Sequence, residues 1–358
     1  MSQLDQTMRQ VLAFPREAGT PGAEAARDLV AQHLEALGYR VERQPFSFNP
    51  SSLNGFPVFG AGLGALGLLL LMPLSSRALP PWLALLVLGG GLGLLTAGSV
   101  GLGLGWLATG AVRQDANLVA TRGAGPVRRW IVAHLDSKAQ AQSMAGRLVA
   151  VWVIGVAVAA LLGLALARLG GPIPMSLAAA VAWLGVLAGA LAGRGRLRGE
   201  SRGARDNGTG VAGALAAAER SIDAATGILI TGGEEFGLVG ARVFAATAPA
   251  RLDGAVVVNL DTIDQEGQLW LVSHDARGSA LAQLEAIRLS SAGLAARLRR
   301  LPLGILTDSL PFARAGVPAV TIGRLTWRTL RTIHTPRDTP DGLSLETAER
   351  VGRALAAN

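Results

Sequence analysis

The chain has 358 residues, of which 50% are hydrophobic and only 16% are charged, and its net charge is +8. Soluble domains carry about 25% charged residues, so part of this chain is expected to lie in a lipid bilayer. It contains no cysteine, which excludes disulfides and thiolate metal sites and leaves histidine and carboxylates as metal ligands. The positive charge is carried almost wholly by arginine, without a nucleic-acid-binding motif. Basic residues that flank lipid-embedded segments explain this charge more simply, so no nucleic acid partner is predicted.

The N-terminal residues 1–43 carry mixed charges, which predicts a folded segment rather than a signal peptide. Within this segment, Ala23–Leu37 has apolar residues at helical spacing and ends before Gly38. A strand is predicted next, over Arg40–Phe48.

Four uncharged stretches follow, and each is long enough to cross a bilayer, which takes about 20 apolar residues. They are Phe56–Leu74, Trp82–Trp106, Leu148–Ala167 and Leu169–Gly193. Helices of a soluble core keep a polar face, and these stretches have none. We therefore predict an α-helical transmembrane bundle of about four spans, although the length of the second stretch leaves room for a fifth.

The predicted spans form two pairs, joined by the short connections Ser75–Pro81 and Arg168–Pro174. A hairpin returns the chain to the side from which it came, so the remaining segments are expected to form one domain on one side of the membrane. Residues 1–54, 113–146 and 195–358 are predicted to form a discontinuous domain, residues 55–112 the first transmembrane hairpin, and residues 147–194 the second.

Arginines are distributed unevenly about these spans. Six lie on the domain side, namely Arg113, Arg147, Arg194, Arg196, Arg198 and Arg202. Each hairpin tip carries only one, Arg77 or Arg168. The positive-inside rule therefore predicts a multi-pass protein of an inner or plasma membrane, with its domain on the cytoplasmic side.

Outside the spans, short β-branched runs alternate with helical patterns. The runs are Asn117–Thr121, Arg129–Ala133, Gly227–Thr231, Ala255–Leu260, Leu269–Ser273 and Ala319–Ile322. Helices are predicted between some of them, at Gly210–Arg220 and Ser279–Ala296. Continuous apolar strands are typical of buried sheets, so we predict an α/β fold with a mostly parallel sheet covered by helices on both faces.

Three of these strands end at side chains that can bind a metal. His134 and Asp136 follow Trp130–Ala133, Glu234 and Glu235 follow Ile228–Thr231, and Asp261 follows Val256–Leu260. In open α/β sheets, ligands bind beyond the carboxyl ends of the strands, so these residues are expected to converge. Two loops add candidates, with Asp206 before an alanine-rich helix and His334 and Asp338 near the C-terminus.

Two histidines and three carboxylates without cysteine suit zinc or another borderline divalent ion. If one carboxylate bridges, such a set can hold two ions about 3.5–4 Å apart, which together polarise a carbonyl and activate water. A further carboxylate has to stay free to take the proton of that water. The adjacent pair Glu234 and Glu235 fits this division of roles.

Taken in order, these residues resemble the co-catalytic di-zinc aminopeptidases, family 28 of the metallopeptidases. The segments that match are Ala133–Ser137, Gly203–Gly210, Gly233–Ala241, Asn259–Asp261 and His334–Thr339, with support from Arg16–Gly22 and Thr307–Phe312. The resemblance covers everything except the apolar inserts, and it implies a zinc exopeptidase-like fold and two zinc ions per chain.

The resemblance also implies a role for each matched residue. His134 and Asp261 would hold one zinc ion, Glu235 and His334 the other, and Asp206 would bridge them, with Glu234 as general base, Asp136 orienting His134 and Asp338 as a candidate to orient His334. The expected activity is hydrolysis of peptide substrates by a membrane-bound aminopeptidase.

The sequence departs from the family in two places. A hairpin is inserted between His134 and Asp206, and Ile333 stands before the last histidine, where some relatives have a tyrosine that stabilises the oxyanion. No acidic anchor for a substrate amino terminus is identified.

Three alternatives remain at this point. The first is a glutaminyl cyclase, which resembles this fold but uses one zinc ion, or another amidohydrolase. The second is a non-catalytic membrane receptor or scaffold. The third is a transporter, which would need ionisable residues inside its spans, and the predicted spans carry none. The oligomeric state is left open.

Overall fold

The computed structural model describes residues 2–221, 223–300 and 305–356, and they divide into two compact units. The α/β unit contains the residues up to Phe48, Val112–Ala139 and the residues from Gly199 onward. The helical unit contains Asn49–Ala111 and Gln140–Arg198. Both units are discontinuous in sequence.

The α/β unit is built on one mixed sheet of eight strands. The strands are β1 (Arg40–Phe48), β2 (Arg113–Thr121), β3 (Arg129–His134), β4 (Thr226–Thr231), β5 (Val256–Ile263), β6 (Gln268–Ser273), β7 (Ala296–Arg300) and β8 (Ala319–Leu325). Their order in the sheet is β1-β2-β4-β3-β5-β8-β6-β7. The central strands β4, β3, β5 and β8 are parallel, as predicted. The pairs β1–β2, β2–β4 and β6–β8 are antiparallel, and the edge strand β7 is parallel to β6.

The first insert interrupts a β-hairpin. Strand β1 ends at Phe48 and β2 begins at Arg113, and these two residues are partners in the antiparallel register. Residues 49–112 therefore stand where a short β-turn would otherwise connect the two strands.

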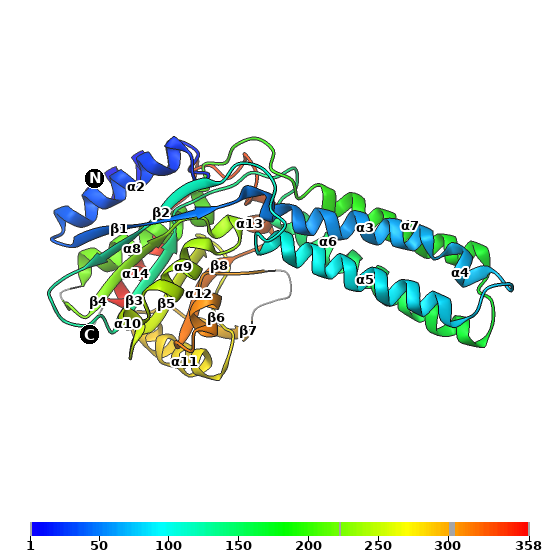
Figure 1. Ribbon diagram of the computed structural model, residues 1–358. Coiled ribbons are helices and arrows are strands. Elements are labelled where there is room, and N and C mark those ends of the chain that lie inside the picture. The colour runs from blue at the N-terminus through cyan, green and yellow to red at the C-terminus, as the bar shows by residue number, and fades with distance from the viewer. Residues whose placement is uncertain (1, 222, 301–304, 357–358) are drawn as a thin grey trace. The chain divides into compact units, whose positions relative to one another are not determined.

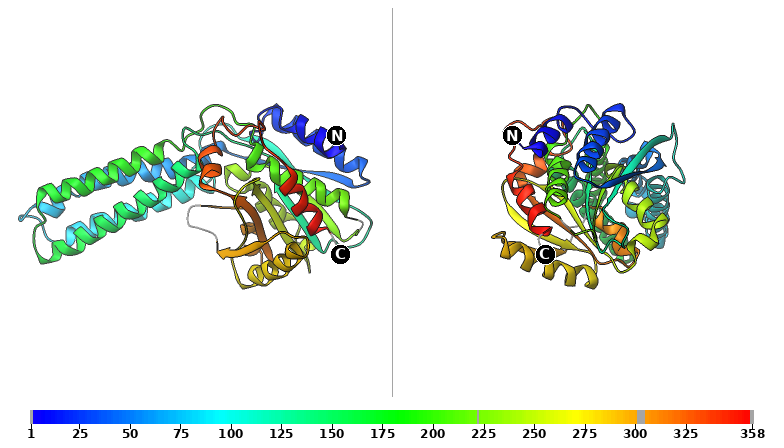
Figure 2. Two further views of the ribbon diagram at one scale, coloured as in Figure 1. Left: turned by 180° about the vertical axis from the view of Figure 1, so that it is seen from behind. Right: turned by 90° about the vertical axis from the view of Figure 1, so that its left-hand side faces the viewer.

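Helices cover both faces of the sheet, which confirms the predicted fold class (Figure 1). They are α1 (Gln3–Val11), α2 (Pro21–Ala36), α8 (Thr209–Arg220), α9 (Val239–Thr247), α10 (Pro249–Leu252), α11 (Ala276–Ser291), α12 (Ser309–Arg314), α13 (Trp327–Thr332) and α14 (Glu346–Leu355). Helices α1, α2, α8, α11 and α14 share one hydrophobic core, and α9, α10 and α12 share the other. In Figure 2, the view from behind shows α14 lying along α8.

The two cores follow from the alternation of side chains along each strand. On β3, Ile131 and Ala133 face the first core, while Trp130 and Val132 face the second. Every strand in the centre of the sheet is therefore apolar on both faces, which is the continuous pattern seen in the sequence.

One strand was not predicted. The predicted helix Ser279–Ala296 ends at Ser291 in the structure, and Ala296–Arg300 forms β7. This strand lies at the edge of the sheet and is mostly exposed, so its sequence is basic and lacks an apolar alternation.

The helical unit contains α3 (Gly55–Leu69), α4 (Leu71–Ser75), α5 (Trp82–Gly103), α6 (Met144–Ala167) and α7 (Met175–Gly193). Within the described residues, four helices are long and apolar enough to cross a membrane, and a fifth is not among them. Figure 1 shows these four helices running side by side. The first predicted span, Phe56–Leu74, is divided at Leu70, where α3 gives way to α4.

Small residues let the helices of this unit pack closely. Helix α3 lies against α7, and a Cβ atom added to Gly189 would lie 2.7 Å from the carbonyl oxygen of Gly60. Large apolar side chains point outward instead, including Leu94, Trp152 and Trp183, which are 78%, 65% and 66% exposed. An outward apolar surface over a tight small-residue interior suits contact with lipid.

Arg168 ties the two hairpins together at their tips. Its side chain is buried and donates hydrogen bonds to the carbonyl oxygens of Pro73 (3.1 Å), Ser76 (2.7 Å) and Leu79 (2.8 Å). We expect Arg168→Met to lower the thermal midpoint of the detergent-solubilised protein, because each carbonyl left without a donor costs roughly 1–3 kcal/mol. The measurement is thermal unfolding followed by circular dichroism.

Arg77 provides the matched control for this prediction, because it lies at the other hairpin tip but is exposed. Arg77→Met should leave the midpoint nearly unchanged. Equal shifts in the two variants would mean that the buried contacts of Arg168 add no stability.

Candidate metal centre

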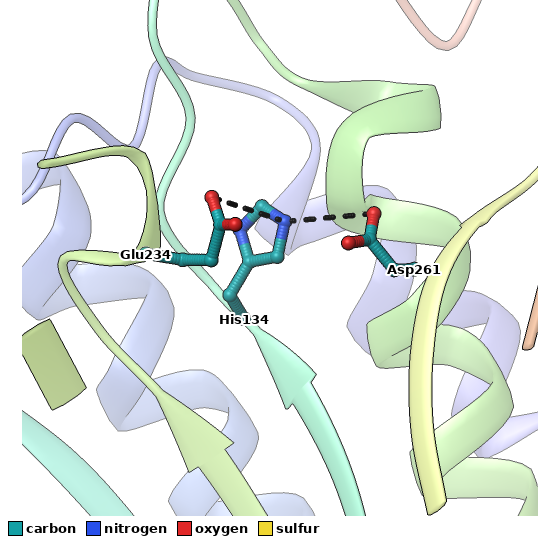
Figure 3. A group of neighbouring side chains, drawn as sticks. All are labelled: His134, Glu234 and Asp261. Carbon is teal, nitrogen blue, oxygen red and sulfur yellow. Dashed lines mark ion pairs between the residues drawn. The ribbon is translucent and has the colours of Figure 1, made fainter. Parts of the chain in front are cut away.

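The predicted site residues gather at the carboxyl ends of the parallel strands. His134 is the last residue of β3, Glu234 and Glu235 begin the helical turn after β4, and Asp261 lies near the end of β5. Figure 3 shows the His134 ring between the carboxylates of Glu234 and Asp261. Its Nε2 atom is 4.0 Å from Glu234 Oε2 and 3.9 Å from Asp261 Oδ1.

A second group is formed by Asp206, Glu235 and His334, and all three residues are buried. His334 Nε2 is 3.1 Å from Asp206 Oδ2 and 3.4 Å from Glu235 Oε2. The other oxygen of Asp206, Oδ1, is 3.3 Å from His134 Nε2. Asp206 thus offers one carboxylate oxygen to each imidazole, so a single side chain joins the two groups.

The donor set fits zinc. It consists of imidazole nitrogens and carboxylate oxygens, and ligand atoms on one tetrahedral zinc ion with bonds of about 2.0–2.1 Å lie roughly 3.3 Å apart. The separations between Asp206 and the two imidazoles are close to this value. Glu235 Oε1 is also buried without a hydrogen-bond partner among the described residues, which leaves a lone pair for an ion.

Asp136 contacts residues of both groups. Its carboxylate accepts hydrogen bonds from the backbone N–H groups of Glu234 and Glu235, both at 3.1 Å. The Nδ1 atom of His134 lies 3.0 Å from the carbonyl oxygen of Asp136 and 3.6 Å from its carboxylate. Asp136 therefore orients His134 through its backbone and positions the two glutamates through its side chain.

Asp338 acts on a different residue from the one predicted. Its buried carboxylate accepts hydrogen bonds from the N–H groups of Arg205 (2.9 Å) and Asp206 (3.1 Å). His334 Nδ1, which it was expected to orient, has no hydrogen-bond partner among the described residues. The turn after His334 brings Asp338 over the start of the Ala204–Gly208 turn, so it positions Asp206 instead.

Asn207 and Gly210 fix the geometry around Asp261. Asn207 accepts hydrogen bonds from the N–H groups of Gly210 and Thr262 and donates one to the carbonyl of Leu260. A Cβ atom on Gly210 would lie 2.2 Å from Asn207 Oδ1, so only glycine fits there. The register of β5 shifts after Leu260, a bulge that lets Asp261 face the site from a buried strand.

The backbone of His334 is in the left-handed region, with a φ of 62°. Residues other than glycine seldom adopt this conformation, and such outliers persist where the surrounding structure holds them, often at functional sites. This outlier supports a functional role for His334.

Arg16 connects the two loops that carry ligands. Its guanidinium is fully buried and donates to the carbonyl oxygens of Leu135 (2.8 Å), Gly203 (3.0 Å) and Arg202. Burial lowers the pKa of Arg16 to about 10, so it stays charged at neutral pH. It joins the loop after β3 to the segment that leads to Asp206.

The two groups differ in their electrostatics. Burial and the neighbouring carboxylates raise the pKa of Glu234 well above its usual range, and burial raises that of Asp261 to about 6. Burial alone would lower the pKa of His134, but the carboxylates around it outweigh this effect and raise its pKa well above the usual range. In the second group, His334 and Lys138 overcome the effect of burial and lower the pKa of Glu235 to about 2.

The sequence reasoning missed Lys138. Its Nζ atom lies 2.6 Å from Glu235 Oε2, and both side chains are buried. The signal that could have found it is composition, because Lys138 is the single lysine among 33 lysine and arginine residues and follows Asp136 by two positions.

Asp308 is a further buried carboxyl group close to the site. One of its oxygens accepts a hydrogen bond from Thr231 Oγ1, and the other has no partner among the described residues. Burial raises its pKa to about 7.

A cavity of about 660 Å³ lies beside the second group. It is lined by Lys138 together with Phe14, Pro15, Glu17, Thr20, Pro21, Gly22, Ala25, Ser137, Ala139, Gly199, Glu200 and Ser201.

These shifts predict an unusual pH dependence for the metal-free protein. Glu234, Asp261, Asp308 and Asp338 all have a raised pKa, caused chiefly by burial, so the folded state binds more protons than the unfolded state. Their contribution to stability is complete below the unfolded pKa of about 4 and is lost as the pH rises to about 7. Asp206 and Glu235, whose pKa is lowered, act in the opposite sense, but chiefly below about pH 5, where the unfolded carboxylates bind protons.

We therefore expect the chelator-treated protein to have a lower thermal midpoint at pH about 8 than at pH about 5. Added zinc should raise the midpoint more at the higher pH, because its ligands must be deprotonated. Thermal unfolding with chelator and with zinc at each pH measures both effects. A chelated protein that is more stable at the higher pH would contradict the prediction.

The family comparison bears out the resemblance predicted from the sequence. The sequence model of peptidase family M28 matches residues 184–358. This region includes Asp206, Glu234, Glu235, Asp261 and His334. A comparison with curated proteins gave no match.

Solved structures share the fold. BSAP, a zinc aminopeptidase from Bacillus subtilis, is 16% identical with a TM-score of 0.60, over 98% of this chain and 93% of that chain. The aminopeptidase from Aneurinibacillus sp. strain AM-1 is 17% identical with a TM-score of 0.57, over 98% and 92%. The glutaminyl cyclase from Fimbriiglobus ruber is 17% identical with a TM-score of 0.56, over 99% and 93%.

Proposed function

We propose that this chain is a membrane-bound zinc aminopeptidase that hydrolyses peptide bonds with a water activated by two metal ions, and the match of residues 184–358 to the sequence model of peptidase family M28 supports this proposal. The observation that carries the proposal is the position of Asp206, whose two oxygens lie 3.3 Å and 3.1 Å from the imidazoles of His134 and His334. A carboxylate shared between two histidine-containing groups is the arrangement that a bridged pair of ions requires.

In this proposal the ligand set is the one expected from the sequence. His134 and Asp261 hold one ion, Glu235 and His334 hold the other, and Asp206 bridges them. When bound, the ions polarise the substrate carbonyl and lower the pKa of the attacking water.

Glu234 performs the proton transfer in this scheme. Its carboxylate lies at the edge of the first group and is 10% exposed, so it can reach a substrate. It takes a proton from the water as the water oxygen attacks the carbonyl carbon, and it returns that proton to the nitrogen of the leaving amine as the C–N bond breaks. Asp136, which binds the N–H groups of Glu234 and Glu235, keeps the base and the ligand in their separate places.

The test measures bound metal and products together. The full-length protein, purified in detergent, is assayed for zinc and for hydrolysis of a panel of N-terminal aminoacyl reporters and short peptides. About two zinc ions per chain and release of the N-terminal residue would support the proposal. A folded protein that binds no metal and hydrolyses nothing would support the receptor or scaffold alternative instead.

The second candidate is a glutaminyl-cyclase-like reaction, favoured by the structural likeness to the enzyme from Fimbriiglobus ruber. The two reactions give different products from a peptide with an N-terminal glutamine. Hydrolysis releases free glutamine, whereas cyclisation releases ammonia and leaves the peptide bond intact. Mass spectrometry of the same reaction mixture separates them.

We also propose that the four apolar helices cross an inner or plasma membrane and that the α/β unit lies on the cytoplasmic side. The helices carry no charged residues over their apolar stretches, and arginines flank the ends that join the α/β unit. Because the chain has no cysteine, single cysteines can report sidedness directly. A membrane-impermeant maleimide should label Ala78→Cys at a hairpin tip in intact cells, but Ser290→Cys on α11 only after lysis. The reverse pattern would place the α/β unit outside the cytoplasm.

A further inference from the structure

The two candidate metal positions differ in one charged neighbour. In the second group, Glu235 Oε2 is 3.4 Å from His334 Nε2 and only 2.6 Å from Lys138 Nζ. The side chains of Lys138 and Glu235 are 2% and 3% exposed, so solvent does not screen this pair. The same carboxylate oxygen therefore faces both the ammonium group and the position of the second ion.

The first group has no such cation. Among the described residues, the only ion pairs of Glu234 and Asp261 are those with His134. Apart from His134, no cationic side chain among the described residues is therefore paired with either carboxylate. The first position thus lacks the lysine or arginine partner that the second position has.

The cation beside the second group is a lysine and not an arginine. Lys138 is the single lysine in a chain that otherwise uses arginine for every basic position. Lysine is almost never fully buried unless it is paired. Its ammonium is a compact point charge, whereas the planar guanidinium of arginine spreads its charge over several donors. The only lysine in the sequence therefore places a compact positive charge next to Glu235, a proposed metal ligand.

We propose that Lys138 makes the two metal positions unequal. The position formed by His134, Asp261 and one oxygen of Asp206 binds its ion tightly, and the position formed by Glu235, His334 and the other oxygen of Asp206 binds its ion weakly and reversibly. This inference rests on the ligand set of the proposed function. The ammonium group repels a divalent ion that shares its carboxylate, and in a buried site this repulsion is strong.

The second position is weakened but not closed. Glu235 Oε1 is buried and has no hydrogen-bond partner among the described residues, so it can bind an ion while Oε2 stays with Lys138. Occupancy of this position would then follow the concentration of free zinc, and the ion count of the protein would change with its surroundings.

The test is a zinc titration of the full-length protein in detergent, stripped of metal and then equilibrated with zinc buffers, with bound zinc measured by elemental analysis. We expect two binding steps whose dissociation constants differ by at least about tenfold. Lys138→Met should tighten the weak step by about tenfold or more and change the tight step by less than about threefold. Lys138→Arg, which keeps the charge, should preserve the gap.

His334→Ala assigns the two steps without a change at Lys138. It should remove the weak step and leave the tight one. Two equal steps in the wild type, loss of the tight step in His334→Ala, or weaker second binding in Lys138→Met would each overturn the inference.

The same titration separates this inference from the proposed function. Unequal steps in a protein that hydrolyses no peptide would support the inference and contradict the function. Peptide hydrolysis by a protein with two equal steps would do the opposite.

Discussion

Glu234→Gln is expected to reduce peptide hydrolysis by about 10²–10⁴-fold while the zinc content stays at the wild-type value. Glutamine has nearly the same shape as glutamate but cannot accept a proton from water. The backbone N–H of Glu234 bonds to Asp136, and this contact does not depend on the side chain that is replaced. Steady-state kinetics and elemental analysis of the same preparation measure the two quantities.

Glu235→Gln is the matched comparison, because the two residues are adjacent but have different expected roles. It should lower the zinc content, since Glu235 Oε2 lies 3.4 Å from His334 Nε2 in the second group. Glu266→Gln, at an exposed position, should change neither quantity. If Glu234→Gln lost zinc and Glu235→Gln kept it, the roles of base and ligand would have to be exchanged.

Arg16→Met is expected to lower the free energy of unfolding of the α/β unit by about 3–5 kcal/mol, because it leaves buried carbonyl groups without donors. The guanidinium of Arg16 bonds to the carbonyl oxygens of Leu135, Gly203 and Arg202. Methionine fills a similar volume but donates no hydrogen bond. Because folded domains are stable by only about 5–15 kcal/mol, the loss should be visible as a large fall in the thermal midpoint.

Arg9→Met supplies the control for this experiment, since Arg9 is exposed on α1. Its midpoint should stay close to that of the wild type. Arg16→Lys should rescue little of the loss, because an ammonium on a flexible stem does not reproduce the planar fork of donors. A small effect in Arg16→Met would mean that the ligand loops are held by their other contacts, such as those of Asp338.

The metal site was the part of the structure most accessible to sequence reasoning. His134, Glu234 and Asp261 each follow or end an apolar run, and the carboxyl ends of parallel strands meet at one edge of a sheet. Their convergence in Figure 3 therefore follows from local patterns together with one topological rule. The apolar helices could be predicted equally well, because an uncharged apolar run of about 20 residues usually forms a membrane-spanning helix.

The roles of the supporting residues were less accessible. Asp136 contacts His134 through its backbone carbonyl, as expected, but the sequence did not indicate that its carboxylate accepts from the N–H groups of Glu234 and Glu235. Asp338 was expected near His334 but binds the N–H of Asp206. A hydrogen bond between residues far apart in sequence depends on how loops cross, and no spacing pattern encodes that crossing.

Composition and periodicity alone indicated that this chain combines an α/β fold with four helices that contain long uncharged stretches, and that only histidine and carboxylates could serve as metal ligands. Helices and strands are indicated by the local pattern of apolar residues, and the possible metal ligands follow from the absence of cysteine. Both properties can therefore be read from a single sequence. The tertiary structure alone decided that Arg16 joins the two ligand loops, that β7 extends the edge of the sheet, and that Lys138 meets Glu235. Each of these depends on contacts across long separations, whose geometry is set by the packing of the whole unit rather than by any local pattern.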